Sequence, residues 1–306
     1  MTASSSTTVQ AAGRFEQPGA AGRHAARLTG GSATTREYVM KPILQVQAAA
    51  PGAERRACGA CRHGEGLDFS FSYAYQPIVD VQTRQVFAHE ALVRGPNGES
   101  ALSVLARVNE DNRYRFDQAC RVKAIETAAR LDMRSKLSIN FMPNAIYRPE
   151  LCIRTTLQAA RDHDFPVERI IFETVEGERV NDGKWLAEVL REYQRIGFLT
   201  AIDDFGAGFA GLNLLADFQP DIVKLDMELV RHIDQRPARQ AIVCGVTRIC
   251  EELDIDVIAE GVETLDEFLC LQQMGIRLIQ GYLFSKPLFE ACVPAWERVW
   301  PESVAS

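Results

Sequence analysis

The sequence of 306 residues lacks the features of a membrane or exported protein. No apolar run reaches the length of a membrane span, and the N-terminus has no succession of charged, apolar and small residues typical of a secretory signal. These absences predict a cytoplasmic protein. An excess of positive charge is also missing, because the net charge is −7 at pH 7. An acidic chain argues against binding to nucleic acid or to an anionic membrane.

Cysteine is present, but its spacing does not predict a complete metal site. Six of the eight cysteines are scattered along the chain, as expected for buried, reduced thiols. The other two, Cys58 and Cys61, lie near His63 and together supply three zinc ligands where a structural site needs four. Arg62 separates Cys61 from His63, which excludes the c-type haem motif. A structural or redox role for this pair remains an alternative to no special role.

Residues 1–66 lack a persistent apolar period. Ser, Thr, Ala, Gly and Arg dominate, and up to Arg62 there are eight Lys or Arg against three Glu. This composition is typical of a disordered or flexible tail. We therefore expect a tail over residues 1–66, either a solvated linker or a partner-binding arm, and a folded domain over residues 67–306.

Beyond the tail, short apolar runs alternate with helical patterns. Eight runs have the character of strands: 73–81, 86–93, 136–141, 169–172, 198–204, 221–225, 256–259 and 278–283. Two of the intervening stretches show the 3.6-residue period of a helix that packs by one side. Their predicted buried faces are Leu186, Val189, Leu190 and Tyr193 in 185–196, and Ile242, Val246, Ile249 and Leu253 in 238–253.

Eight strands that alternate with helices predict an α/β fold, a (β/α)8 TIM-like barrel. Only residues 82–85 separate the first two strands, which is too short for a crossover helix. The first strand should therefore be antiparallel. An open doubly wound sheet is the alternative, and it is disfavoured because no Gly-x-Gly-x-x-Gly turn follows the first parallel strand.

Polar residues close the predicted strands at their C-terminal ends, where the active sites of such barrels are built. At the fifth strand, Asp203 and Asp204 follow an apolar run and precede Gly206. Two adjacent carboxylates repel each other unless a cation joins them, although an acidic pair is also typical of a solvated loop. The tripeptide Asp204-Phe205-Gly206 occurs in protein kinases too, but the other kinase motifs are missing here.

The strand ends offer a set of oxygen ligands for a metal: Glu90, Asn140, Glu173, Asp203 and Asp204. Oxygen ligands select Mg²⁺ or Mn²⁺ over Zn²⁺. Four carboxylates carry too much charge for one divalent ion, which predicts a pair of ions bridged by an Asp, as in phosphoryl chemistry. Lys224 and Arg94 supply the positive groups that an anionic substrate would need.

These residues belong to a series of motifs along residues 69–288. The motifs are Tyr75-Gln76-Pro77-Ile78-Val79-Asp80, Glu90-Ala91-Leu92-Val93-Arg94, Asn140, Glu173-x-x-Glu176, Asp203-Asp204-Phe205-Gly206, Lys224-Leu225-Asp226, Glu260-Gly261-Val262-Glu263-Thr264 and Gln280-Gly281-Tyr282. With them the chain resembles the EAL domain, the cyclic di-GMP phosphodiesterase family. It is especially similar to the EAL domains joined to blue-light-sensing flavin modules. Val175 departs from the Thr that the family usually has, which bears on the loop after the fifth strand more than on the chemistry.

The resemblance implies a role for each matching residue. The five oxygen ligands would bind two Mg²⁺ or Mn²⁺ ions, with Asp203 as the bridge. Lys224 and Glu260 would position and activate the attacking water, with Asp226 supporting the second ion. The residues that would contact substrate are Gln76, Leu92, Arg94, Glu263 and Gln280. Those that would couple the loop after the fifth strand to dimer contacts are Glu176, Phe205 and Gly206.

The implied reaction is hydrolysis of one phosphodiester of cyclic di-GMP to linear pGpG, which lowers a bacterial second messenger. The alternative is a degenerate EAL domain that binds cyclic di-GMP or a protein partner without cleavage. Degenerate members lose metal ligands or the catalytic Glu, and this sequence keeps them all. The family also implies a homodimer, paired through residues 207–218 and 227–232.

Overall fold

The computed structural model describes residues 67–146, 148–175, 183–207 and 211–293. Within them a sheet closes on itself in the order β2-β3-β4-β5-β6-β7-β8-β1, and β1 pairs with β2. The predicted (β/α)8 barrel is therefore confirmed. The tail over residues 1–66, with Cys58 and Cys61, lies outside the described residues.

The strands are β1 (Ser72–Asp80), β2 (Gln85–Arg94), β3 (Lys136–Asn140), β4 (Ile170–Val175), β5 (Leu199–Phe205), β6 (Ile222–Leu225), β7 (Asp256–Ala259), β8 (Leu278–Gln280) and β9 (Leu288–Phe289).

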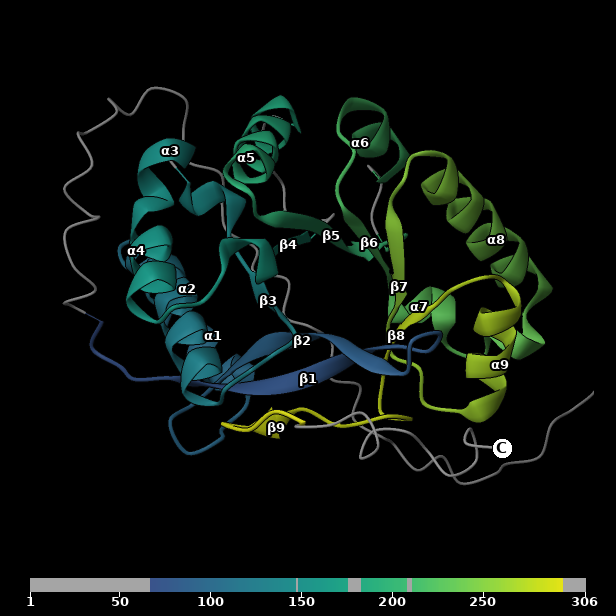
Figure 1. Ribbon diagram of the computed structural model, residues 1–306, viewed down its shortest axis with the longest axis horizontal. Coiled ribbons are helices and arrows are strands. Elements are labelled where there is room, and N and C mark those ends of the chain that lie inside the picture. Colours follow the sequence, from purple (N-terminus) through teal and green to yellow (C-terminus); the bar gives the residue numbers. More distant parts are fainter. Residues whose placement is uncertain (1–66, 147, 176–182, 208–210, 294–306) are drawn as a thin grey trace, which may run out of the picture. The chain divides into compact units, whose positions relative to one another are not determined.

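Helices lie around the outside of these strands (Figure 1). They are α1 (Ala101–Leu105), α2 (Arg113–Arg130), α3 (Pro149–Cys152), α4 (Arg154–Asp162), α5 (Gly183–Ile196), α6 (Gly211–Asp217), α7 (Met227–Val230), α8 (Pro237–Glu252) and α9 (Leu265–Gln273). Short 3₁₀ turns occur at Pro143–Ala145, Val167–Arg169 and Ile233–Gln235. In the part of the chain that is described, no helix combines the length and the apolar character needed to span a membrane.

The first strand is antiparallel to both of its barrel neighbours, as predicted from the short connection that follows it. It pairs with β2 along its whole length and with β8 at its C-terminal end. Asp80 makes the tight turn possible, because its Oδ1 accepts the N–H groups of Gln82 at 2.9 Å and Thr83 at 3.1 Å. The short strand β9, which the sequence did not predict, lies beside β1 at Ala74 and Tyr75.

An apolar layer fills the interior of the barrel on the N-terminal side of the candidate site residues. Each strand residue in this layer is small or aliphatic and buried: Ile78, Ala88, Ile171, Ala201, Ile222, Ile258 and Leu278. Because side chains two residues apart on a strand face the same side, the next inward position on each strand lies directly above this layer. These next positions form the candidate site described below.

The prediction of the buried face was right for α5, but for α8 it was right only at Val246. In α5, Leu186, Val189, Leu190 and Tyr193 are all buried. In α8 the buried residues are Val243, Val246, Thr247 and Cys250. The predicted residues Ile242, Ile249 and Leu253 are 51%, 37% and 38% exposed. Both faces of α8 carry apolar residues at helical spacing, so periodicity alone did not identify the packed one.

The eighth strand ends earlier than the predicted range 278–283. After Gln280 the chain leaves the ladder and bonds to the loop that follows β7, where Leu283 N–H donates to Val262 O at 3.1 Å. Gly281 makes this crossing possible, since a Cβ at its position would lie 1.9 Å from Val262 O. The early end leaves Gln280 as the last barrel residue of β8.

Candidate active site

Polar side chains form a layer directly above the apolar one. On five strands, and directly after β7, the residue two positions beyond the apolar layer is polar: Glu90, Glu173, Asp203, Lys224, Glu260 and Gln280. On the antiparallel β1 the corresponding residue, Gln76, precedes Ile78 instead of following it. All seven side chains are buried. The predicted site residues on these strands are thus brought to one level by the register of the barrel.

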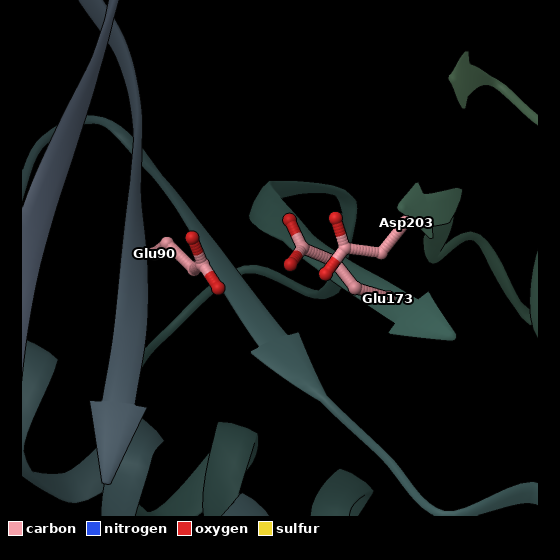
Figure 2. Close-up of side chains that lie close together, drawn as sticks. All are labelled: Glu90, Glu173 and Asp203. Atoms are coloured by element: carbon pink, nitrogen blue, oxygen red, sulfur yellow. The ribbon is translucent and has the colours of Figure 1, made fainter. Parts of the chain in front are cut away.

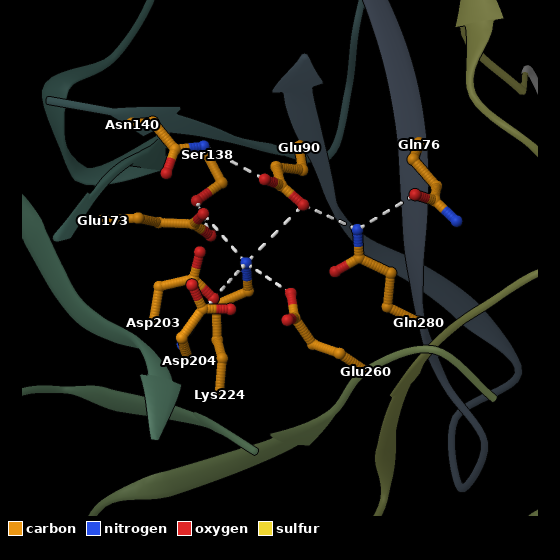
Figure 3. Close-up of polar contacts among 10 residues, drawn as sticks. All are labelled: Gln76, Glu90, Ser138, Asn140, Glu173, Asp203, Asp204, Lys224, Glu260 and Gln280. Carbon is orange, nitrogen blue, oxygen red and sulfur yellow. Dashed lines mark hydrogen bonds and ion pairs between the residues drawn. The ribbon is translucent and has the colours of Figure 1, made fainter. Parts of the chain in front are cut away.

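Lys224 lies at the centre of this layer (Figure 3). Its Nζ is 2.6 Å from Glu260, 2.9 Å from Glu173, 3.2 Å from Asp203 and 3.5 Å from Glu90. The lysine is fully buried, so its charge depends on these carboxylates for compensation. One ammonium group therefore links carboxylates from β2, β4, β5 and the residue directly after β7.

The layer holds more negative charge than Lys224 can balance. Burial raises the pKa of Glu173 to about 8, with the Lys224 charge opposing this shift and the charges of Glu90 and Asp203 adding to it. Burial would lower the pKa of Lys224, but the carboxylates around it, Asp203 first, raise it well above the usual value. The lysine stays charged while its neighbours repel each other, an arrangement that favours the entry of further cations.

Two groups of carboxylates in this layer could each hold a metal ion. Glu90, Glu173 and Asp203 have oxygen atoms within 4.8 Å of one another (Figure 2). In a second group, Asp203, Asp204 and Glu260, the oxygen atoms also lie within 4.8 Å of one another. Asp203 belongs to both groups, as a ligand shared by two ions would. The donors are all oxygen atoms, which suits Mg²⁺ or Mn²⁺.

A local irregularity in β5 allows two consecutive aspartates to serve the site. On a regular strand Asp204 would face away from Asp203. The register of β5 with β6 shifts between Ile202 and Phe205, and Asp204 has a φ of 55°. Such bulges redirect side chains, and Asp tolerates a positive φ better than most residues. Asp204 is half-buried and its N–H donates to Asp203 Oδ1 at 2.9 Å.

The motifs and this geometry agree with one protein family. A family profile described as EAL domain matches residues 66–287. The chain belongs to the EAL domain family. The resemblance deduced from the motifs is thereby confirmed.

Curated relatives of this EAL domain include longer proteins. BluF of Escherichia coli K12, a blue light- and temperature-regulated antirepressor, is 34% identical over 232 residues, which are 75% of this chain and 57% of BluF. The cyclic di-GMP phosphodiesterase PA2567 of Pseudomonas aeruginosa is 27% identical over 242 residues, 76% of this chain and 41% of PA2567. The chain therefore spans little more than half of BluF and less than half of PA2567.

Solved structures of similar chains share the fold. A standalone EAL protein from Vibrio cholerae O395 in its c-di-GMP-bound form is 55% identical, with a TM-score of 0.73, and the match covers 75% of this chain and 97% of that one. Klebsiella pneumoniae BlrP1 in a manganese/cy-diGMP complex is 39% identical, with a TM-score of 0.69, and the match covers 72% of this chain and 56% of that one.

Amide side chains orient the carboxylate of Glu90 in this EAL domain. Asn140 Nδ2 donates to Glu90 Oε1 at 3.0 Å, and Gln280 Nε2 donates to Glu90 Oε2 at 2.7 Å. Gln280 Nε2 also lies 3.3 Å from Gln76 Oε1. Asn140 is exposed at the mouth of the barrel, whereas Gln280 is buried. Predicted residues from β1, β2, β3 and β8 thus form one connected network.

Ser138 is part of the EAL domain site although sequence reasoning missed it. Its buried Oγ donates to Glu173 Oε1, while Lys224 Nζ binds Glu173 Oε2 at 2.9 Å. Both oxygens of this carboxylate therefore have a partner. A signal was available, because Ser138 lies two positions before Asn140 and so shares its face of β3.

Three other predicted residues lie at the edge of the EAL domain site. Asp226 is buried and caps α7, where its Oδ1 accepts the N–H of Glu228 at 2.8 Å. Arg94 is half-buried, and burial lowers the pKa of its guanidinium. Glu263 is exposed and pairs with Arg231 at 3.0 Å instead of joining the carboxylate layer.

The predicted coupling loop is only partly described. Phe205 is buried and its carbonyl oxygen accepts the N–H of Asp226 at 3.2 Å. Gly206 has a φ of +98°, and a Cβ there would lie 2.5 Å from Leu229. The glycine thus lets the end of β5 approach α7 closely. Glu176 lies outside the described residues.

Proposed function

We propose that this EAL domain hydrolyses cyclic di-GMP to linear pGpG in the bacterial cytoplasm. The observation that carries the proposal is the buried layer in which Lys224 lies among Glu90, Glu173, Asp203 and Glu260. PA2567 is named as a cyclic di-GMP phosphodiesterase, and the Vibrio cholerae and Klebsiella pneumoniae proteins were solved with cyclic di-GMP. These relatives support the substrate proposed here.

Two divalent ions, Mg²⁺ or Mn²⁺, would be held by Glu90, Asn140, Glu173, Asp203 and Asp204. The donors fit such ions because they are oxygen atoms from an acidic layer. Asp203 also belongs to both clusters of carboxylates, so it could serve both ions. When bound, the ions would polarise a phosphate and lower the pKa of a water molecule. The manganese complex of BlrP1 supports this choice of cofactor.

The chain's own residues would orient the water and take its proton. Lys224 Nζ lies 2.6 Å from Glu260 Oε1 and so holds this carboxylate in one orientation. The water oxygen would attack phosphorus and pass a proton to Glu260. The bond from phosphorus to the 3′ oxygen would break, and that oxygen would leave as an alcohol after taking up a proton. Asp226 at the start of α7 would support the second ion.

The proposed substrate contacts surround this centre. Arg94 follows the Glu90 motif on β2, and its guanidinium, which proteins do not deprotonate, would bind a substrate phosphate. The remaining contacts would come from Gln76, Leu92, Glu263 and Gln280. Of these, Leu92 is half-buried, which leaves part of its side chain accessible to a base or ribose.

The test is turnover of cyclic di-GMP by the purified chain in Mg²⁺, Mn²⁺, Ca²⁺ or EDTA, with the nucleotides separated by chromatography. Linear pGpG should form with Mg²⁺ or Mn²⁺ and should not form with EDTA. Ca²⁺ is larger and less strict in geometry, so it should bind and inhibit. Glu260→Gln should bind substrate without cleaving it. Strong activity with Ca²⁺ alone would contradict the metal assignment.

A non-catalytic EAL domain is the second candidate. It is favoured by BluF, which is named as an antirepressor and is 34% identical. In that case the chain would bind cyclic di-GMP or a protein partner, and no pGpG would form under any metal condition. Calorimetric binding of cyclic di-GMP without formation of pGpG in the same buffer would identify a non-catalytic receptor, whereas formation of pGpG would identify the phosphodiesterase.

We further propose a homodimer, in which α8 joins the expected surface around residues 207–218 in place of residues 227–232. The short helix α7 directs Val230 into the core, so residues 227–232 offer little apolar surface for pairing. On the next helix, α8, Ile242 and Ile249 are exposed, and so is Leu253 directly after the helix. On α6, Leu212 is 59% exposed, while residues 208–210 between β5 and this helix are outside the described residues. These exposed residues of α8 and α6 support a surface for a second copy.

A further inference from the structure

A fully buried arginine lies on the outer side of β3 and β4, behind the carboxylate layer. Arg121 on α2 has no exposed surface, and its Nη2 lies 2.8 Å from Asp117 Oδ2. Its Nη1 donates to the hydroxyl of Tyr193 at 2.8 Å. The guanidinium carbon is 5.4, 5.1 and 5.8 Å from the ring centres of Phe141, Phe172 and Tyr193. The cation is therefore enclosed by one carboxylate and three aromatic rings.

Stability alone gives a poor explanation of this ion pair. Taking two charges out of water costs about as much as their attraction returns, and apolar residues of similar volume are often equally or more stabilising. Aromatic rings around the cation recover part of that cost. The contacts of the pair point instead to what it holds in place.

Asp117 holds the chain just beyond β3. Its second oxygen, Oδ1, accepts the N–H of Met142 at 2.9 Å. The preceding N–H, of Phe141, donates to the carbonyl oxygen of Glu173 at 3.0 Å. Asn140 and Glu173 are partners in the ladder between β3 and β4. One carboxylate on α2 thus fixes the backbone two residues after Asn140.

The aromatic contacts reach the same two strands. Phe141 follows Asn140 and Phe172 precedes Glu173, and neighbours on a strand face opposite sides of the sheet. Both rings therefore pack against Arg121 outside the barrel, while Asn140 and Glu173 belong to the site inside it. We propose that Asp117 and Arg121 are a positioning pair that holds Asn140 and Glu173 in place for metal binding. This inference rests on the proposed function, because it assigns metal ligation to Asn140 and Glu173.

The test uses two double variants of the full chain. Removing one member of the pair would leave an uncompensated buried charge, so both charges are removed together. Asp117→Leu with Arg121→Met also removes the acceptor for the Met142 N–H. Asp117→Asn with Arg121→Met keeps an acceptor oxygen at that position. The variants share the loss of charge and differ in the anchor of Met142.

The measurement is Mn²⁺ binding by isothermal titration calorimetry, with melting temperatures as the check on folding. The leucine variant should bind Mn²⁺ about tenfold more weakly than the wild type, since partners behind metal ligands typically contribute this much or more. The asparagine variant should remain within about twofold of the wild type. Equal affinity in the wild type and the leucine variant would overturn the proposal. A wild type that neither binds Mn²⁺ nor cleaves cyclic di-GMP would refute the proposed function instead.

Hydrogen–deuterium exchange of the wild-type chain tests the anchor of Met142 without any substitution, and so does not depend on the folding of the leucine variant. If Asp117 anchors Met142, the Met142 amide should exchange with deuterium as slowly as the ladder amides of β3, in metal-free protein as well. Exchange at the rate of an exposed loop amide would mean that the anchor does not persist, and the proposal would fail.

Discussion

Lys224 determines how the site tolerates the loss of a carboxylate. Its ammonium contacts four carboxylates, so removing one still leaves three. We predict that Glu90→Ala and Asp203→Asn each abolish turnover, while the melting temperature of the metal-free protein holds or rises because fewer buried like charges repel. Turnover with Mn²⁺ and thermal melting in EDTA measure the two effects. Early melting of either variant would show that the residue is mainly structural.

His89 should make the folded chain sensitive to acid. It is 2% exposed, with Nδ1 2.7 Å from Ser135 Oγ and Nε2 accepting the N–H of Val293 at 3.3 Å. Burial lowers the pKa of His89 to about 4, whereas an unfolded histidine has a pKa of about 6.5. Between these pH values the unfolded chain binds a proton that the folded chain does not. Stability from this residue is therefore fully present above about pH 6.5 and is lost as the pH falls toward 4.

The check on His89 is urea unfolding at neutral pH and at pH values between the two pKa values. The wild type should lose up to roughly 3 kcal/mol more than His89→Gln over this range. His163→Gln, which alters an exposed histidine, is the matched control and should behave like the wild type. The same pH dependence in all three proteins would show that His89 does not titrate as stated.

At the scale of elements, strands were easier to predict than the local geometry that completes the site. The C-terminal ends of the apolar runs placed Glu90, Glu173 and Asp203 at the site, because the carboxyl ends of parallel strands meet at one face of a barrel. The bulge that turns Asp204 toward the site was not predictable, since adjacent identical residues give no signal of φ. The two-residue strand β9 was too short to show a period.

Helix faces were predictable only where one face was apolar. In α5 the apolar residues form a single stripe, and that stripe is buried. In α8 an exposed stripe with Ile242 and Ile249 lies beside the buried one with Val243 and Val246. Packing against the barrel decided which stripe was covered. The second stripe is the reason for assigning α8 to the proposed homodimer.

The exposed stripe of α8 gives a test of assembly. Ile242→Glu combined with Ile249→Glu should convert the dimer into a monomer, because a carboxylate is costly to bury in an apolar interface. Light scattering across a dilution series measures the mass, and specific activity is recorded at each concentration. Leu102→Glu, at a 59% exposed position on α1, is the matched control. Activity should fall with dissociation, as expected if pairing shifts the loop beside Asp203 and Asp204. A wild type that is monomeric and fully active at every dilution would contradict this coupling.

For the whole molecule, the closed sheet suggests that the barrel folds without the N-terminal tail. The first barrel strand begins at Ser72, and the eight strands that close the sheet lie between Ser72 and Gln280. We therefore propose residues 1–66 as a segment separate from the barrel over residues 67–306.

Deletion of residues 1–53 should leave the turnover number for cyclic di-GMP within about twofold of the full chain, since a positioned site is sensitive to small displacements and this deletion should cause none. Steady-state turnover of both chains at saturating Mn²⁺ measures the effect, with Glu260→Gln in the shortened chain as the inactive control. A tenfold or larger loss would place the tail in contact with the barrel, because no described strand or site residue is removed by the deletion.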